Sequence, residues 1–155
     1  MIIDKEKTVC MSGHRGIDSD LNVEELYQKL YDLAIKYDTF LVGMAVGFDT
    51  ICAKCLIKIR DRFLERKIRI IACIPCENQA DRFSFFQKRE YKKILQLVDE
   101  KIVLNKTYTS TCMMERNRFM VDNSSYLLAY LRRNYGGTYN TVSYAKKKGI
   151  TVEII

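Results

Sequence analysis

Several segments of the chain place glycine beside side chains that bind anions, and the first is Ser12-Gly13-His14-Arg15-Gly16. It follows the short apolar run 8–12. Glycine lets the backbone approach a ligand closely, and arginine can bind phosphate oxygens with two parallel hydrogen bonds. His14 is the only histidine of the chain, so it is either a structural residue or the one imidazole available for chemistry. The segment predicts a loop that binds an anionic ligand through Ser12, Gly13, His14 and Arg15.

A second glycine-containing segment, Gly43-Met44-Ala45-Val46-Gly47-Phe48-Asp49, lies between the apolar run 39–42 and a helical pattern. Backbone N–H groups at a helix N-terminus attract anions. The spacing is not that of the dinucleotide fingerprint G-x-G-x-x-G, and no lysine follows as it does in a P-loop. We therefore expect a general anion site formed by Gly43, Met44, Ala45 and Gly47. Asp49 either binds a ribose hydroxyl or caps the helix.

The third segment, residues 75–82, is polar and follows the apolar run 69–74. Its candidate ligand-binding residues are Pro75 and Gln79. The alternative is a solvated loop in which Asn78 or Asp81 caps the next helix.

A fourth segment, Glu115-Arg116-Asn117-Arg118, lies within a short helical pattern. Asn117 falls on the apolar stripe of that helix, where a polar side chain needs a hydrogen-bond partner. It therefore either ties two loops together or points at a ligand. Arg116 would add positive charge to the site. Glu115 and Asp49 are the candidate catalytic carboxylates.

The fifth segment, Gly136-Gly137-Thr138-Tyr139-Asn140-Thr141, leads into the last helical pattern. Two adjacent glycines keep side-chain bulk away from the backbone, and such a segment before a helix N-terminus is typical of a phosphate cradle. The alternative is a flexible turn with an asparagine or threonine cap. The residues expected to bind the ligand are Gly136, Gly137, Thr138, Asn140 and Thr141.

The elements that must position these segments alternate between strands and helices along the whole chain. Apolar runs predict strands over residues 8–12, 39–42, 69–74, 101–104, 126–131 and 150–155. Helical spacing predicts helices over residues 22–37, 51–63, 83–98, 113–121 and 141–148. This alternation predicts an α/β fold with a Rossmann-like, doubly wound, mainly parallel sheet and helices on both faces. Ligands of such folds bind at the carboxyl ends of the strands, where these segments lie.

Four of the six cysteines have the spacing of a zinc ribbon, with Cys52-x-x-Cys55 followed by Cys73-x-x-Cys76. Cys52 and Cys55, however, lie in a helical pattern. Cys73 lies in an apolar strand, whose neighbouring residues point to opposite faces. Free cysteine often acts as a small core residue. We therefore expect buried thiols and no metal site.

Length and composition bound the function. The chain has 155 residues, which argues for a single domain over residues 1–155. Its 26 basic and 19 acidic residues give a net charge of +7, which permits phosphate, nucleotide or nucleic-acid partners. No apolar stretch approaches the ~20 residues of a membrane span, and residues 1–7 lack the apolar region of a secretory signal. We therefore expect a cytoplasmic protein with no membrane partner.

Taken in order, these segments resemble those of the SLOG superfamily. The motifs that carry the resemblance are Ser12-Gly13-His14-Arg15, Gly43-Met44-Ala45-x-Gly47-x-Asp49, Pro75-x-Glu77-x-Gln79, Arg116-Asn117-Arg118-x-Met120-Val121-Asp122 and Gly136-Gly137-Thr138-x-Asn140-Thr141. The branch that the chain most resembles is that of the YpsA- and YoqJ-like proteins of Gram-positive bacteria and their phages. The resemblance implies a Rossmann-like domain that binds a nucleotide-type ligand and requires no further cofactor.

Relatives in the superfamily include phosphoribohydrolases that release a base from a nucleoside monophosphate, the DNA-processing protein DprA, and sensor domains for NAD-derived or ADP-ribose-like signals. The chain departs from the hydrolases at two points. Residues 141–146 carry no carboxylate where the hydrolases place a catalytic glutamate, and Lys54 stands where close relatives often have an acidic residue. The carboxylates left for acid–base work are Asp49, Glu77, Glu115 and Asp122.

The residues and the resemblance together favour a sensor or sequestering module for a nucleotide-derived small molecule of the NAD or ADP-ribose type. The first alternative is a hydrolase that cleaves an N-glycosidic or phosphate bond of a nucleotide. The second is a DprA-like DNA-binding module. The basic residues are dispersed without an aromatic-interleaved stripe, so nucleic acid is the least favoured partner. Domains of this kind often pair, so a homo-oligomer is compatible with the sequence.

Overall fold

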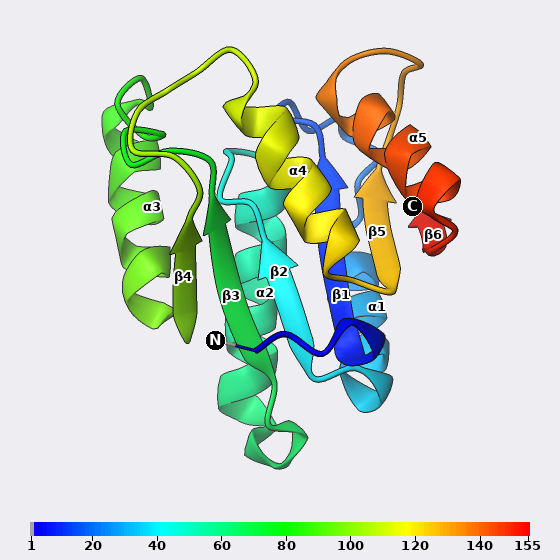
Figure 1. Cartoon of the computed structure of the whole chain (residues 1–155). Coiled ribbons are helices and arrows are strands. Elements are labelled where there is room, and N and C mark those ends of the chain that lie inside the picture. The colour runs from blue at the N-terminus through cyan, green and yellow to red at the C-terminus, as the bar shows by residue number, and fades with distance from the viewer. Residues whose placement is uncertain (1) are drawn as a thin grey trace.

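A computed structural model describes residues 2–155, and within them six strands form one sheet in which every neighbouring pair is parallel (Figure 1). The strands lie in the order β4-β3-β2-β1-β5-β6. Their bounds are β1 (Thr8–Gly13), β2 (Thr39–Val42), β3 (Arg69–Ile74), β4 (Glu100–Val103), β5 (Tyr126–Tyr130) and β6 (Thr151–Ile154). The predicted Rossmann-like fold is confirmed, and the sheet is parallel throughout.

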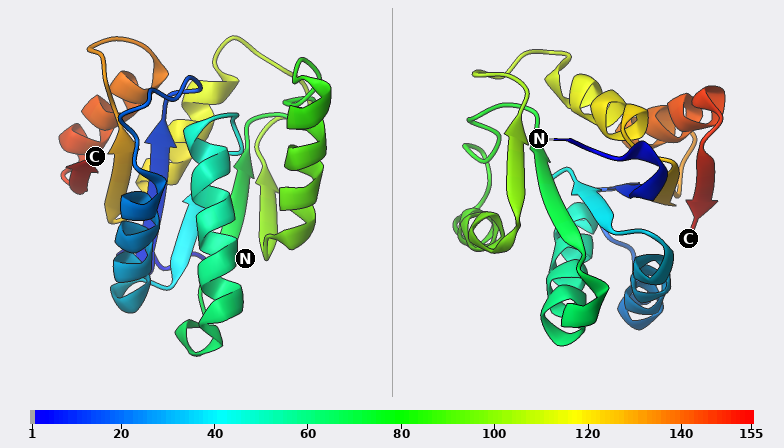
Figure 2. Two further views of the ribbon diagram at one scale, coloured as in Figure 1. Left: turned by 180° about the vertical axis from the view of Figure 1, so that it is seen from behind. Right: turned by 60° about the horizontal axis from the view of Figure 1, so that its bottom comes forward.

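Helices cover both faces of the sheet, as predicted (Figure 2). On one face lie α1 (Val23–Lys36), α2 (Phe48–Arg62) and α3 (Phe85–Leu97). On the opposite face α4 (Cys112–Asp122) packs against α5 (Gly137–Lys148). Two short 3-10 helices, Lys5–Lys7 and Leu64–Arg66, were not predicted. None of the helices within residues 2–155 has the length and apolar character that a membrane span requires.

The strand order reverses between β1 and β5. β1 to β4 follow one another across the sheet, after which the chain returns to the other side of β1 as β5. The register pairs Ser12 with Ala129 and Gly13 with Tyr130, so both strands end at the same level. The helices that follow these two strands, α1 and α5, cover opposite faces (Figure 2). A doubly wound sheet binds ligands at such a switch point.

The sheet separates two apolar cores because neighbouring strand residues point to opposite faces. Phe40 of β2 belongs to the core beneath α1, α2 and α3, whereas Leu41 belongs to the core beneath α4 and α5. The cysteines follow the same division, with Cys52 and Cys55 in the first core and Cys73 in the second. All six cysteines are buried and free. The first cysteine pair of the zinc-ribbon spacing and Cys73 of the second therefore lie in different cores, on opposite faces of the sheet.

The start of α1 agrees with the prediction, and the start of α5 does not. Asn22 caps α1 by accepting a hydrogen bond from the N–H of Glu25 at 3.1 Å. α5 begins at Gly137, so residues 137–141 form its first turn rather than a loop before it. The predicted phosphate cradle is thus the N-terminus of a helix.

The start of α3 also differs from the prediction. α3 begins at Phe85 and is capped by Ser84, whose hydroxyl accepts from the N–H of Gln87 at 3.2 Å. The Gln87 side chain in turn accepts from the N–H of Ser84 at 2.9 Å. This reciprocal capping box satisfies two backbone donors, so α3 is capped by Ser84 and not, as the alternative interpretation of the loop had it, by Asn78 or Asp81.

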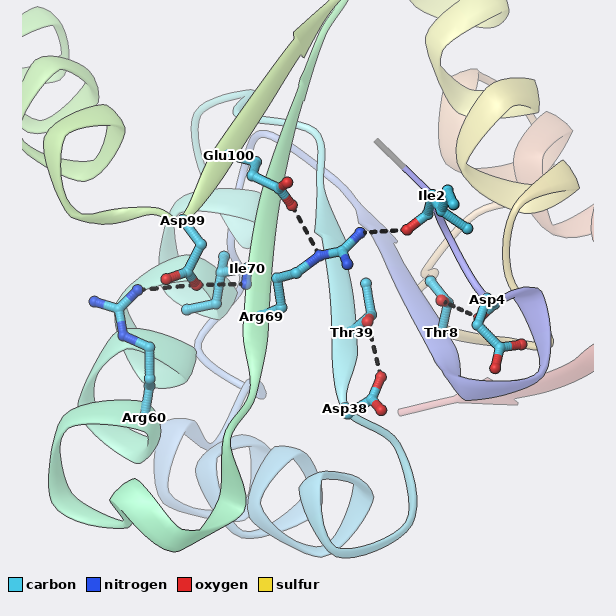
Figure 3. Close-up of polar contacts among 10 residues, drawn as sticks. All are labelled: Ile2, Asp4, Thr8, Asp38, Thr39, Arg60, Arg69, Ile70, Asp99 and Glu100. Atoms are coloured by element: carbon cyan, nitrogen blue, oxygen red, sulfur yellow. Dashed lines mark hydrogen bonds and ion pairs between the residues drawn. The ribbon is translucent and has the colours of Figure 1, made fainter.

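Polar contacts tie elements together at the amino-terminal edge of the sheet (Figure 3). Arg69 at the start of β3 forms an ion pair with Glu100 of β4 at 2.8 Å. Asp99 accepts from the N–H of Ile70 at 2.8 Å and from the guanidinium of Arg60 at 3.1 Å. These contacts join α2, β3 and the start of β4 at the edge opposite the predicted ligand site.

Gly13, the last residue of β1, lies against the ring of Phe48 at the start of α2. A β-carbon at Gly13 would overlap the Phe48 side chain, and overpacking of this kind costs about 1–3 kcal/mol. We expect Gly13→Ala to lower the free energy of unfolding by that amount in urea denaturation. Gly16→Ala is the matched control, because nothing lies within 4 Å of the position that its methyl group takes. Equal losses in the two variants would contradict this packing.

Candidate functional site

A cleft with a volume of about 320 Å³ lies at the carboxyl ends of β1, β2 and β5. Its walls come from the loops that follow these strands and from the first half of α4. The residues that line it are Ser12, Gly13, His14, Arg15, Gly16, Ala45, Asp49, Met113, Arg116, Asn117, Arg133, Gly137 and Thr138. The cleft therefore brings together residues from the first, second, fourth and fifth segments that the sequence singled out.

Two helices begin at this cleft without a capping side chain. α2 starts after Gly47 and α5 starts after Gly136, and neither residue provides a side-chain hydrogen bond to the first turn. The first N–H groups of a helix have no partner inside it and carry partial positive charge. Asp49 of α2 and Gly137 and Thr138 of α5 line the cleft. The positive ends of both helix dipoles therefore lie at the same space.

His14 joins the loops on either side of the switch point. Its carbonyl oxygen accepts from the N–H of Phe48 at 3.2 Å, and its Nε2 accepts from the N–H of Arg132 at 2.9 Å. An acceptor at Nε2 places the proton of the neutral ring on Nδ1. Burial, and after it the charges of Arg133 and Arg132, lower the pKa of His14. The lowered pKa favours the neutral imidazole, and the two hydrogen bonds of His14 hold the loops after β1 and β5 and the start of α2 together.

Asp49 and Arg116 approach each other at Gly43, from α2 and α4 respectively. A β-carbon at Gly43 would lie 2.8 Å from Asp49 Oδ2 and 2.7 Å from Arg116 Nη1. Both charged residues are buried, with 6% and 5% of their surfaces exposed. A β-carbon at Gly43 would therefore force the end of the Arg116 or the Asp49 side chain to move.

The guanidinium of Arg116 is held by acceptors from two segments. Nη1 donates to the carbonyl oxygen of Gly43, and Nε donates to Asn117 Oδ1 at 2.8 Å. Burial lowers the pKa of Arg116, and the negative charge of Asp49 counteracts this effect. Arginine nevertheless stays protonated in proteins. The wall of the cleft therefore contains a buried positive charge, and Asn117 lines the cleft while its Oδ1 holds the guanidinium of its helix neighbour Arg116.

Asp49 has an unusual environment for a carboxyl group. Its Oδ2 accepts from the N–H of Ala45 at 3.2 Å. Burial raises the pKa of Asp49 to about 6, and Arg116, the Ala45 N–H and Arg15 limit this rise. Gly47 occupies the N-cap position of α2, so the expectation that Asp49 caps this helix is wrong. Asp49 is instead a buried carboxyl whose pKa lies well above that of an ordinary aspartate.

The loop between β2 and α2 is strained at Met44, a buried residue with a φ of 63°. The left-handed backbone costs about 1–2 kcal/mol for a residue with a β-carbon. Such a conformation persists where surrounding contacts fix it, and it is found more often at functional sites than elsewhere. Here the carbonyl of Gly43 and the N–H of Ala45 are both hydrogen-bonded to buried side chains, which fixes the backbone on either side of Met44.

Positive charge dominates the cleft. Arg15 and Arg133 are exposed residues of its lining, and Arg116 is buried in its wall. These three arginines and two helix N-termini provide positive charge, and Asp49 provides the one carboxyl group of the lining in the described part of the chain. The resulting positive electrostatic potential favours an anion. The planar guanidinium group matches the geometry of phosphate oxygens. The arrangement can hold phosphate groups. Within residues 2–155, no cluster of three His, Cys, Asp or Glu side chains is placed to hold a metal ion.

The chain also matches a known family over most of its length. The sequence model of YpsA, described as "YspA SLOG family", matches residues 20–152. The chain belongs to the YpsA family of SLOG proteins. The YpsA match includes the cleft residues contributed by α2, α4 and α5. The loop after β1, with Ser12 to Arg15, precedes the matched region.

An individual relative supports the same branch of the family. The chain is similar to YoqJ of Bacillus subtilis (strain 168), which is described as an uncharacterized SPbeta prophage-derived protein. The two are 28% identical over 123 residues, which make up 70% of this chain and 69% of YoqJ. The predicted YpsA/YoqJ-like branch of the SLOG superfamily is thus confirmed.

Two solved structures of DNA processing protein A share the fold of this YpsA-family chain. DprA from Streptococcus pneumoniae has a TM-score of 0.69 at 17% identity, over 97% of this chain and 50% of DprA. DprA from Helicobacter pylori, whose structure is described for its single-stranded DNA binding mode, has a TM-score of 0.69 at 16% identity, over 97% of this chain and 66% of that protein. The chain spans only part of either DprA, and identities this low show a common fold alone.

Some predicted ligand-binding residues of this YpsA-family chain lie outside the cleft, namely Gly43, Met44, Gly47, Pro75, Gln79, Gly136, Asn140 and Thr141. Two of them contact segments that carry cleft residues. Gln79 Nε2 donates to the carbonyl of Gly43 in the loop after β2 at 3.3 Å, and the Thr141 hydroxyl donates to the carbonyl of Gly137 within α5 at 2.8 Å. The carbonyl of Pro75 accepts from Asn105 at 3.1 Å, a contact between the loops after β3 and β4.

Glu115, the second candidate catalytic carboxylate, does not line the cleft. It is exposed, and its Oε2 accepts from Asn105 at 3.2 Å. Consecutive residues of a helix point roughly 100° apart, so Glu115 turns away where Arg116 and Asn117 turn inward. Asp49 is left as the candidate carboxyl of the cleft.

The sequence reasoning missed Gly16, Met113 and Arg133, which also line the cleft. Arg133 lies between the end of β5 and the glycine pair at the start of α5, and this position is a signal that could have identified it. Met113 precedes Arg116 by three residues and Asn117 by four, a spacing that puts all three on one face of α4.

The raised pKa of Asp49 predicts a pH dependence of stability. The carboxyl has an ordinary pKa of 3.8, which applies to the unfolded chain, whereas the folded protein keeps the proton to about pH 6. The folded state therefore binds more protons between these values, and stability falls as the pH rises through them. Asp49→Asn cannot ionise, so it should gain up to about 3 kcal/mol relative to the unaltered protein between pH 4 and pH 7 in urea denaturation.

Glu77→Gln, which removes an exposed carboxyl from the loop after β3, controls for the loss of one negative charge. A stability difference between Asp49→Asn and the unaltered protein that stays constant from pH 4 to pH 7 would contradict the raised pKa.

Proposed function

We propose that the cleft binds the phosphate groups of a nucleotide or of a nucleotide-derived ligand of the NAD or ADP-ribose type, and that the protein acts as a sensor or sequestering module for it. One observation carries the proposal. Two helix N-termini without side-chain caps converge with Arg15, Arg116 and Arg133 at the switch point of the sheet. Each of these features favours phosphate on its own.

Polar side chains beside these donors favour a ribose-bearing ligand over a simple anion. Asp49, Asn117 and Thr138 line the same cleft and supply a carboxyl, an amide and a hydroxyl. A cleft of about 320 Å³ lies within the size range of small-molecule sites. We assign the ribose hydroxyls to Asp49 and Asn117. Asn140, which was also predicted to bind the ligand, lies outside the cleft lining.

Hydrolysis of the nucleotide is a second candidate function because of Asp49. A carboxyl with a pKa of about 6 can take up or release a proton near neutral pH. Against hydrolysis, α5 carries no carboxylate along residues 137–148, and Glu115 is turned away from the cleft. Binding needs fewer groups than hydrolysis does, so it is our main proposal.

Single-stranded DNA is a further candidate ligand for the same cleft. The DprA of Helicobacter pylori is described for its single-stranded DNA binding mode, and this chain has a net charge of +7. That likeness weakens the expectation that nucleic acid is the least favoured partner. A common fold does not carry the function from one protein to the other, so an oligonucleotide belongs in the test.

Arg133 provides a test of phosphate binding because it is exposed and lines the cleft. We expect AMP, ADP, NAD or ADP-ribose to raise the melting temperature, and calorimetry to give the dissociation constant. A charge-assisted hydrogen bond contributes about 1.5–3 kcal/mol, so Arg133→Gln should weaken binding about ten-fold or more. Arg82→Gln removes the same charge from an exposed position outside the cleft and should leave binding unchanged.

Equal weakening by Arg133→Gln and Arg82→Gln would indicate unspecific charge attraction, and no binding of any nucleotide would contradict the proposal. Free base or phosphate in the same mixtures would favour hydrolysis. Tight binding of a single-stranded oligonucleotide that falls steeply with salt, and that nucleotides do not displace, would favour DNA.

Gly137 provides a steric test at the N-terminus of α5. Nothing lies within 4 Å of the position of a β-carbon at Gly137, and the residue lines the cleft. A larger side chain is therefore compatible with the fold but occupies the approach to the first-turn N–H groups. We expect Gly137→Leu to abolish nucleotide binding in calorimetry while urea denaturation shows a retained fold. If a folded Gly137→Leu variant binds nucleotide with unchanged affinity, the phosphate does not bind at this helix terminus.

A further inference from the structure

A second cavity of about 360 Å³ lies between α2 and α3, which are neighbours on one face of the sheet (Figure 2). We call it the α2–α3 groove, and its lining includes Met44, Ile51, Phe83, Phe86 and Tyr91. The loop after β2 separates the groove from the cleft. Met44 and Gly47 of this loop line the groove, whereas Ala45 and Asp49 line the cleft. A ligand that crosses a single loop therefore reaches both sites.

Aromatic rings form much of the wall of the groove. Phe83 and Tyr91 meet edge to face with their ring centroids 5.7 Å apart. Phe86 lies beside them on the first turn of α3 with 77% of its surface exposed. A large apolar ring left in water gains free energy when a flat apolar partner covers it. Exposed aromatic side chains bind nucleobases in this way, by stacking.

The charges of the groove suit a neutral ring rather than a phosphate. Glu90 lines the groove and forms an ion pair with Lys54 at 2.7 Å. Among the residues described, no arginine lines the groove, in contrast to the three arginines of the cleft. The amino groups of nucleobases donate hydrogen bonds, and a carboxylate accepts them. Phosphate is therefore favoured in the cleft, and a heteroaromatic ring with donor groups is favoured in the groove.

A chain of hydrogen bonds connects the two sites. The hydroxyl of Tyr91 donates to Gln79 Oε1 at 3.4 Å, and Gln79 Nε2 donates to the carbonyl of Gly43 at 3.3 Å. Arg116 of the cleft donates to the same carbonyl oxygen. The floor of the groove and the charged wall of the cleft are therefore fixed relative to each other by one acceptor.

We propose that the α2–α3 groove holds the heteroaromatic base of the nucleotide whose phosphate groups occupy the cleft, with Phe86 stacked on the base. This assignment rests on the proposed function, since it needs the cleft to hold phosphate. It narrows the ligand to a nucleotide in an extended conformation that crosses the loop after β2.

The test compares two adjacent phenylalanines. Phe85 and Phe86 are exposed to similar extents, 73% and 77%, but only Phe86 lines the groove. Calorimetric titrations would use ADP, NAD and ADP-ribose as probes with a base, and inorganic pyrophosphate and ribose 5-phosphate as probes without one. Loss of base stacking should make Phe86→Ala weaken the tightest base-containing probe about five-fold or more. Phe85→Ala should leave all affinities unchanged, and neither variant should alter pyrophosphate binding.

The outcomes separate this inference from the proposed function. If Phe86→Ala binds the base-containing probes as the unaltered protein does, or if both variants weaken them equally, the base is not in the groove and the phosphate cleft stands. If pyrophosphate binds as tightly as every base-containing probe, the base adds nothing to the affinity, and its assignment to the groove is wrong. If the unaltered protein binds none of the probes, the proposed function fails and this inference fails with it.

Discussion

The carbonyl oxygen of Gly43 is the acceptor on which the carboxyl edge of the sheet depends. Arg116 from α4 and Gln79 from the loop after β3 both donate to it, so three segments distant in the sequence meet at one atom. Arg116 is almost fully buried, and a buried charge is costly unless hydrogen bonds compensate for it. This requirement fixes α4 against the loop that leads to Asp49. A side chain at Gly43 would displace the Arg116 guanidinium or the Asp49 carboxyl from these positions.

The parallel sheet turns this local contact into a site because its helices begin at the same edge (Figure 1). The helices that line the cleft differ in their N-terminal caps from those that do not. α1 and α3, which do not line the cleft, are capped by the side chains of Asn22 and Ser84. α2, α4 and α5, which line it, have no side-chain cap. Side chains therefore cap the helices away from the cleft, whereas at the cleft the N–H of Phe48 is held by the carbonyl of His14 and α5 starts without a side-chain cap.

The sheet could be predicted because buried parallel strands appear as continuous apolar runs, and β2 and β3 have the predicted bounds. The start of α5 could not be predicted, because glycine is a poor helix former and the periodic apolar pattern begins only at Thr141. The loops of the site could be predicted because they follow strands. The directions of their side chains depend on how α4 is rotated, which turns Arg116 inward and Glu115 outward. The left-handed Met44 has no signal in the sequence, since its residue type disfavours that backbone.

Asp49 and Arg116 make proton binding and anion binding depend on each other. Burial raises the pKa of Asp49 and lowers that of Arg116, so each charge compensates only in part for the burial of the other. A phosphate group in the cleft adds negative charge near both, which stabilises the guanidinium of Arg116 and the protonated form of Asp49. Such coupling is reciprocal. If bound phosphate raises the proton affinity of Asp49 by some factor, protonation of Asp49 raises the affinity for phosphate by the same factor. If phosphate binds as proposed, its affinity should therefore depend on the proton of this one buried carboxyl near pH 6.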